Sequence, residues 1–215
     1  MCMEHTLSFK QAWELIGGLG TPSKMPCYSW SISARKCKTG GKLRKVADSI
    51  CEKCYAFRGN YNFRVVVNAQ EKRLQATKNP QWVEAMVIAI KGTNSNGYFR
   101  WFDSGDLQSV KMLSDICEIA RRLPKVKFWL PTKEYKIVSD YVKGGGVIPD
   151  NLNVRLSAYI VDGELPIELA KRLNCTTSGV TEEKSNCPSS NQGNKCLDCR
   201  KCWNKNVVNV NYQKH

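Results

Sequence analysis

The sequence predicts an α/β protein built on a parallel sheet and followed by a cysteine-rich, metal-binding tail. Three observations predict it: strand and helix patterns alternate from 98 to 180, four cysteines are closely spaced near the C-terminus, and a basic, cysteine-containing segment spans 25–60. Such alternation indicates parallel strands joined by right-handed crossovers. Because five or six strands are too few for a closed eight-stranded barrel, we expect a partial barrel or an open sheet over 1–180, with 181–215 as a tail packed on it.

The individual elements follow from hydrophobic periodicity and from glycine and proline stops. Helices are expected at 7–20, 60–78, 81–91, 107–123, 133–142 and 165–173. Strands are expected at 28–33, 98–102, 126–130, 153–158 and 175–180.

Composition narrows the class of protein. The chain has 215 residues, a formal net charge of +14 and eleven cysteines, with no apolar run long enough to span a membrane and no signal-peptide pattern. These features predict a cytoplasmic protein in a reducing compartment, whose cysteines bind metal rather than form disulfides. The histidines are His5 and His215, near the two chain ends, so we expect no histidine-centred catalytic triad inside the fold.

The positive charge is concentrated near the N-terminus. From 35 to 73 there are eleven Lys or Arg residues against three acids, and the densest part contributes six: Arg35, Lys36, Lys38, Lys42, Arg44 and Lys45. Such a patch attracts nucleic acid or another polyanion, although it also fits a solvated surface loop. The interleaved aromatic residues either stack on bases or pack around metal sites, and they are Tyr28, Trp30, Tyr55, Phe57, Tyr61 and Phe63.

Eight of the cysteines fall into two sets of four. The tail set has a Cys-x2-Cys-x2-Cys run with a distal Cys-Pro, and consists of Cys187, Cys196, Cys199 and Cys202. This spacing favours a [4Fe-4S] cluster, with zinc or a thiol-rich tail as alternatives. The second set, with a tight Cys-x2-Cys pair, consists of Cys27, Cys37, Cys51 and Cys54. We therefore expect one or two clusters, and core packing for the leftover Cys117.

Polar residues follow two predicted strands where a parallel sheet binds its ligands. We expect catalytic roles, in orienting a ligand or moving protons, for Asp103, Asp106 and Lys133. Cofactor contacts are expected from Ser104, Thr132 and Glu134. The alternative is that Ser104, Asp106 or Glu134 begins or caps the helix that follows.

These motifs together resemble the bacteriophage gene product 88 family of small cysteine-rich proteins. The resemblance covers most of the chain and is carried by the segments 25–31, 51–61, 99–106, 127–134, 154–157 and 187–203. That family is in turn faintly similar to radical S-adenosylmethionine proteins, which implies a cluster before a partial α/β barrel and S-adenosylmethionine as a candidate ligand. Those proteins use a Cys-x3-Cys-x2-Cys loop, whereas here Cys37 precedes Cys51 by fourteen residues.

Two functional hypotheses of different class follow. The first is an iron–sulfur protein with radical-enzyme-like architecture that acts on nucleic acid and keeps one iron open, with three cysteines on that cluster. The second is a non-catalytic nucleic-acid-binding protein whose iron–sulfur or zinc sites are structural staples.

Overall fold

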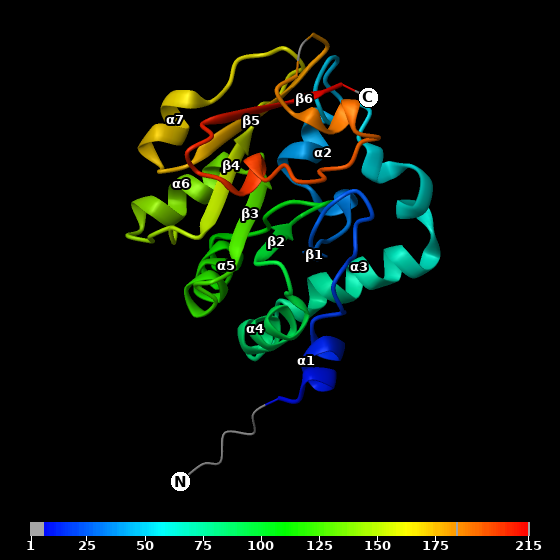
Figure 1. The fold of residues 1–215 in the computed structure, drawn as a ribbon, viewed down its shortest axis with the longest axis vertical. Helices are drawn as coiled ribbons and strands as arrows, with labels where there is room; N and C mark the ends of the chain where they lie inside the picture. The colour runs from blue at the N-terminus through cyan, green and yellow to red at the C-terminus, as the bar shows by residue number, and fades with distance from the viewer. Residues whose placement is uncertain (1–6, 184, 215) are drawn as a thin grey trace.

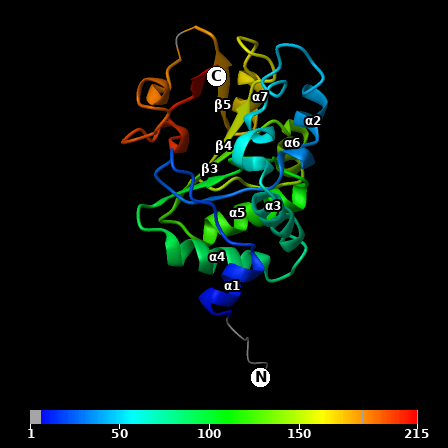
Figure 2. The same ribbon diagram turned by 90° about the vertical axis from the view of Figure 1, so that its right-hand side faces the viewer.

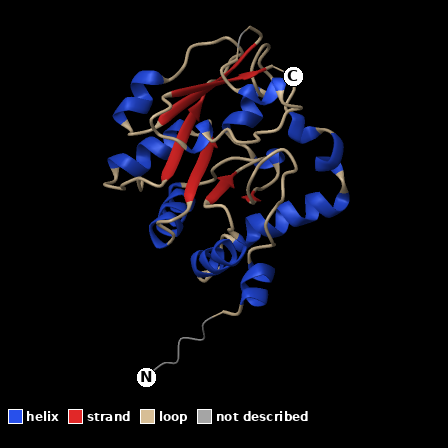
Figure 3. Ribbon diagram, viewed as in Figure 1, coloured by secondary structure: helices blue, strands red, loops and turns tan. Residues whose placement is uncertain are grey.

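The computed structural model describes residues 7–183 and 185–214 and shows a mixed α/β fold around an open parallel sheet (Figures 1 and 3). Six strands pair in chain order in this part, each parallel to the next. They are β1 (Ser29–Trp30), β2 (Tyr98–Trp101), β3 (Lys127–Thr132), β4 (Leu152–Ser157), β5 (Thr176–Thr181) and β6 (Asn209–Gln213). The sheet does not close, so the open-sheet alternative is the one observed.

The helices lie mainly on one face of this sheet. They are α1 (Phe9–Leu15), α2 (Thr39–Leu43), α3 (Arg64–Ala76), α4 (Trp82–Thr93), α5 (Val110–Arg122), α6 (Tyr135–Lys143) and α7 (Ile167–Arg172). The apolar sides of α1, α4, α5 and α6 form one continuous core with strand residues such as Phe99, Phe128 and Val154. We call this side of the sheet the helix face.

The other side of the sheet, the tail face, is covered by the chain between β5 and β6. Side chains of successive strand residues alternate between faces, so Phe128 and Leu130 belong to the main core while Trp129 packs against Trp203 from this connection. The short 3₁₀ helix η5 (Lys201–Trp203) contacts β3 and β4. Figure 2 shows this orange segment and helices α6 and α7 on opposite sides of the strands.

Three elements differ from the sequence-based expectation. The expected strand 28–33 is reduced to the two residues of β1, and the expected tail supplies a sixth strand, β6. Helix α2 forms inside the basic segment although it contains Gly40 and Gly41, because tertiary contacts described below hold its first turn.

His5 and His215 lie outside the described residues, and so does Cys2, which belongs to neither set of four cysteines. Within the described part of the chain, no helix combines the length and apolar character needed to cross a membrane.

Candidate metal centres and the strand-end site

Three thiols gather beside helix α2, and we call them the three-thiol group: Cys37, Cys51 and Cys54. A Cβ atom built on Gly40 would lie 3.4 Å from Sγ of Cys51 and 3.7 Å from Sγ of Cys37, so both sulfurs border the same point. Burial raises the pKa of Cys37 and that of Cys51, and the nearby Lys133 ammonium opposes the rise at Cys51. Gly40 leaves room for these sulfurs that any larger residue would fill.

Five other thiols gather under the tail, and we call them the five-thiol group: Cys27, Cys187, Cys196, Cys199 and Cys202. Cys27 and Cys202 are buried with Trp129 and Trp203 in a second apolar cluster, separate from the main core. Burial raises the pKa of Cys27 to about 12 and that of Cys202 to about 11. The expected grouping of Cys27 with the N-terminal set is therefore wrong, because the chain before β1 faces the tail.

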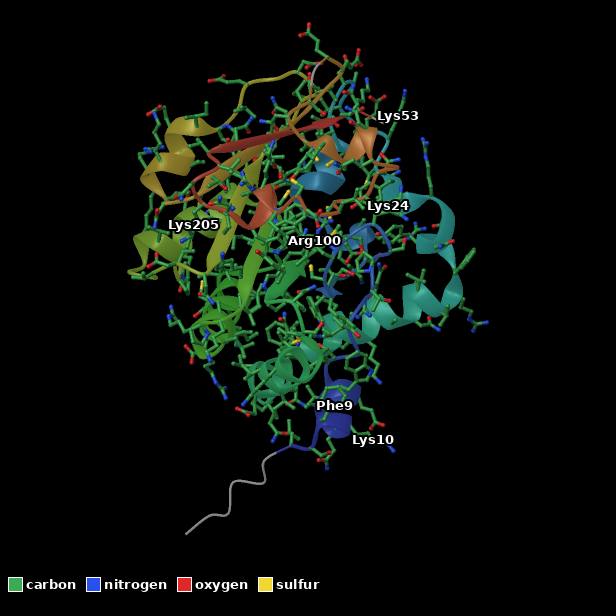
Figure 4. All side chains as sticks on the ribbon, in the orientation of Figure 1. Phe9, Lys10, Lys24, Lys53, Arg100 and Lys205 are labelled. Atoms are coloured by element: carbon green, nitrogen blue, oxygen red, sulfur yellow. The ribbon has the colours of Figure 1, made fainter. Side chains whose placement is uncertain are left out.

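Arg100 is a buried cation next to the five-thiol group, in the middle of the molecule (Figure 4). Its guanidinium lies 4.3 Å from the centroid of Trp129, and it interacts electrostatically with Asp103 and with the thiols of Cys27 and Cys202. It forms no ion pair with any carboxylate of residues 7–183 or 185–214, and its Nε has no hydrogen-bond partner there. A buried cation without a paired carboxylate is stabilised by an anionic neighbour.

A second arginine, Arg155 of β4, is fully buried and holds the tail on the sheet. It donates five hydrogen bonds of 2.8–3.2 Å to backbone carbonyls, those of Thr177, Lys201, Cys202, Asn204 and Val207. Asn153 adds a bond of 2.9 Å to the Cys202 carbonyl. The backbone around Cys202 is therefore fixed by side chains from the middle of the sheet.

As the side chains lie, no three His, Cys, Asp or Glu residues of the described chain converge closely enough to hold a single metal ion. Binding of metal by either thiol group thus requires the thiols to turn toward a common centre. Two other cysteines take no part: Cys117 is fully buried in the core as expected, and Cys175 packs against that core.

The expected strand-end residues Asp106, Thr132, Lys133 and Glu134 do come together, at the carboxyl ends of β2 and β3. The Asp106 carboxylate accepts hydrogen bonds from Thr132 Oγ1 at 2.6 Å and from the backbone N–H groups of Lys133 and Leu107, each at 2.8 Å. Burial raises the pKa of Asp106 to about 6, although these bonds favour its ionised form. Asp106 thus joins the two strand ends.

Glu134 connects this site to the three-thiol group. Its carboxylate accepts the backbone N–H of Thr39 at 2.7 Å and the Thr39 hydroxyl at 2.8 Å. Thr39 is the first residue of α2, so a buried carboxylate holds the helix start directly after Cys37 and Lys38. Glu134 also occupies the position before α6, as expected, but its side chain makes no capping bond to that helix.

Asp103 and Ser104 face other partners. Asp103 accepts hydrogen bonds from Ser29 at 2.9 Å and from Tyr61 at 3.1 Å. The buried Ser104 hydroxyl donates to the Ile32 carbonyl at 2.7 Å and accepts from Gln70 Nε2 at 2.8 Å, so its hydrogen-bond partners are other than the thiols. The expectation that Ser104 or Asp106 caps α5 is wrong, because Ser109 caps that helix with a bond of 3.1 Å to Met112 N–H.

The six expected nucleic-acid contacts are all exposed: Arg35, Lys36, Lys38, Lys42, Arg44 and Lys45. They lie on and around α2. Lys36 forms an ion pair of 3.3 Å with Glu71, and Lys38 donates to the Gln108 carbonyl at 2.7 Å. The six basic residues therefore form an exposed patch, but Lys36 and Lys38 already interact with other groups of the protein.

Two grooves flank the tail face, and neither lining includes Asp103, Asp106 or Lys133. One groove of about 310 Å³ is lined by residues that include Met25, Cys27 and Tyr98. A second, of about 770 Å³, runs past Trp203 at the amino ends of the strands. The first groove brings solvent to the edge of the five-thiol group.

Sequence reasoning missed Arg100 and Arg155 as site residues, although the signal was present. Both occur within apolar strand sequences, Phe99-Arg100-Trp101 and Val154-Arg155-Leu156. Strands covered on both faces are normally apolar throughout, so a single arginine in such a strand indicates a polar or anionic neighbour on one face.

Comparison with known proteins places the chain in a family. No curated protein and no solved structure matches its sequence closely enough to indicate a relationship. The sequence profile of the family described as Gene product 88, however, matches residues 6–205, which include both thiol groups and five of the six strands. Because that match covers most of the sequence, the chain belongs to the Gene product 88 family.

Proposed function

We propose that this is an iron–sulfur protein with two thiolate-bound centres, one closed and one open to a further ligand. The observation that carries the proposal is the separation of the cysteines into a group of five and a group of three. Four thiolates complete a [4Fe-4S] cluster, whereas three leave one iron available. In the five-thiol group, the ligands would be four of its members, and the spacing favours the tail cysteines.

The charge around the five-thiol group supports an anionic centre there. The Arg100 Nε has no hydrogen-bond partner among the described residues, and both Arg100 and Arg155 interact electrostatically with Cys202. A cluster with four thiolate ligands is negatively charged, so it would offset buried guanidinium charge that the neutral thiols leave uncompensated. Hydrogen bonds and charges near cluster sulfurs also set reduction potential, which gives Arg100 a function beyond packing.

The three-thiol group would hold the open cluster. When bound, that cluster would supply an electron to a ligand on its free iron, and S-adenosylmethionine is the candidate from the radical-enzyme resemblance. Lys133, beside Cys51, would bind the carboxylate of such a ligand. Asp106 and Glu134 would position the strand ends and α2, since their oxygens already accept hydrogen bonds from the protein.

The test is iron, acid-labile sulfide and zinc per chain on anaerobically purified protein. About eight irons and eight sulfides are expected for two cubane clusters. Cys54→Ser and Cys199→Ser should each lose about four irons. Cys175→Ser is the matched control, because Cys175 belongs to neither thiol group. A serine hydroxyl there can also donate the hydrogen bond that the Cys175 thiol donates to the Leu173 carbonyl. Zinc without sulfide, or equal iron loss in all three variants, would overturn the proposal.

A second candidate function, a metal-stapled nucleic-acid-binding protein without catalysis, is favoured by one observation. The carboxylates of Asp103, Asp106 and Glu134 all accept hydrogen bonds that join segments of the protein, which is what structural carboxylates do. Reductive cleavage of S-adenosylmethionine by the reduced protein decides between the two functions. Cleavage that is lost in Cys54→Ser and retained in Cys175→Ser supports the open centre, whereas no cleavage by iron-replete protein supports the stapled binder.

A further inference from the structure

Helix α2 and four adjoining segments form one exposed surface, which we call the aromatic–basic surface. They are η1 (Ala34–Lys36), α2, η2 (Tyr55–Phe57), η3 (Gly59–Asn62) and the first turn of α3. Each contacts at least one of the others, so the five segments are continuous with one another. Its backbone is mostly short 3₁₀ and helical turns rather than sheet.

Two aromatic residues on this surface are more than half exposed, although one side of the Tyr55 ring packs against Tyr61 at 5.7 Å between centroids. Of the six aromatics interleaved with basic residues in the sequence, Trp30 is fully buried and the Tyr61 hydroxyl is bonded to Asp103. By contrast, Tyr55 and Phe63 are 57% and 58% exposed. Large aromatic side chains normally bury most of their area, so two exposed rings on one patch indicate a binding role.

Positive charge lies on the same surface, where two arginines stack on a third ring, Phe57. Arg44 lies with its guanidinium 3.5 Å from the centroid of Phe57, and Arg35 approaches the same ring at 5.4 Å. Lys42 and Lys45 are exposed and make no ion pair or side-chain hydrogen bond with the described residues. The arginines are thus pre-oriented by Phe57, while the two lysines keep their full charge for a ligand.

The Tyr55 ring and the Phe63 backbone are also held in place. The Tyr55 hydroxyl donates a hydrogen bond to the backbone carbonyl of Asp103, at the end of β2. Phe63 occupies the position directly before α3, where its carbonyl accepts the N–H groups of Val66 and Val67. A fixed aromatic ring loses little conformational entropy when a partner stacks on it.

We propose that the aromatic–basic surface binds single-stranded nucleic acid, with bases stacked on Tyr55 and Phe63 and phosphates contacted by Lys42, Arg44 and Lys45. Stacking on an exposed ring requires an unpaired base, which favours a single strand over a duplex. The net positive charge of the chain, +14, complements the phosphate backbone. This inference goes beyond the proposed metal centres and does not depend on them.

The test is fluorescence anisotropy with a labelled twelve-nucleotide DNA and RNA single strand, and with the matching DNA duplex, on protein as purified. We expect tighter binding to the single strands than to the duplex. Phe63→Ala should weaken single-strand binding about 5- to 150-fold, the range found for loss of one stacked base. Lys42→Gln with Lys45→Gln should flatten the dependence of log affinity on log salt, by about 0.7 for each lost phosphate contact.

Matched controls come from α1 and α4, which lie far from α2 in Figure 1. Phe9→Ala removes another exposed phenylalanine, and Lys10→Gln with Lys91→Gln lowers net charge by the same amount. Iron and zinc content of every variant is measured in the same samples, so loss of a metal centre is distinguished from loss of the surface. Equal effects in test and control variants would overturn the proposal. Preference for the duplex, or self-association without oligonucleotide binding, would do so as well.

Discussion

Arg155→Met should detach the tail from the sheet. The arginine is fully buried and donates five hydrogen bonds, four of them to carbonyls between 201 and 207. Methionine fills much of the same volume but donates no hydrogen bond. The Val207 carbonyl then loses its donor. The carbonyls of Lys201, Cys202 and Asn204 each keep one weaker, uncharged donor. A hydrogen bond donated by a charged group contributes about 1.5–3 kcal/mol net, and a buried acceptor left without a donor costs about 1–3 kcal/mol. We expect the free energy of unfolding to fall by about that amount.

The assay is urea denaturation followed by tryptophan fluorescence, together with limited proteolysis of the 182–208 segment. Trp203 lies in this segment and packs on Trp129, so tail release should change fluorescence before the sheet unfolds. Arg122→Met is the control, because its ion pair with Glu84 is at the surface and such pairs contribute about 0–1 kcal/mol. If Arg155→Met is no less stable than Arg122→Met and its tail stays protease-resistant, Arg155 does not hold the tail.

Three further changes probe the strand-end site. Gly105→Ala should destabilise the protein by more than about 1 kcal/mol, because its φ is +77° and a Cβ would lie 2.4 Å from Ile32 Cγ1; thermal unfolding measures this. Glu134→Gln should weaken the two hydrogen bonds from Thr39 and so loosen the start of α2. Amide hydrogen exchange of residues 38–44 should become faster, and an unchanged exchange rate would contradict this. The raised Asp106 pKa, about 6, means that protonation stabilises the folded state, so this contribution is present below pH 4 and is lost as pH rises through 6. The free energy of unfolding of Asp106→Asn, relative to that of the parent protein, should therefore increase by up to about 3 kcal/mol between pH 4 and pH 7.5. Denaturation of both proteins at each pH measures this, and a difference in stability that does not change with pH would refute it.

Sequence patterns predicted the middle of the sheet well because its strands are covered on both faces. The strands β2 to β5 and the helices between them agree with the expected ranges within a few residues, since apolar periodicity dominates there. The edge strand β6 was missed because Asn209–Gln213 is mainly polar and buries only Val210 completely. Helix α2 was missed because its stability comes from Glu134, far away in sequence, rather than from its own residues.

The candidate site was predicted in part. The strand-end carboxylates were found because parallel strands finish at one edge, and spacing identified the tail cysteines. Spacing could not assign Cys27, because it joins the tail through burial against Trp129 and Trp203. Nor could periodicity show that Asp106 is enclosed by three hydrogen bonds, since these come from turns after two different strands.

The position of Cys27 has a mechanical consequence for an open sheet. Cys27 precedes the first strand and Cys202 precedes the last, about 175 residues later, yet both are buried in the same apolar cluster. A metal that bound both would link the segment before β1 to the connection before β6 over the middle of the tail face, and would make a closed loop of nearly the whole chain. Such a crosslink removes about 5 kcal/mol of conformational entropy from the unfolded chain. A force that pulled the segment before β1 away from the connection before β6 would then act on the metal–thiolate bonds as well as on the apolar contacts of this cluster.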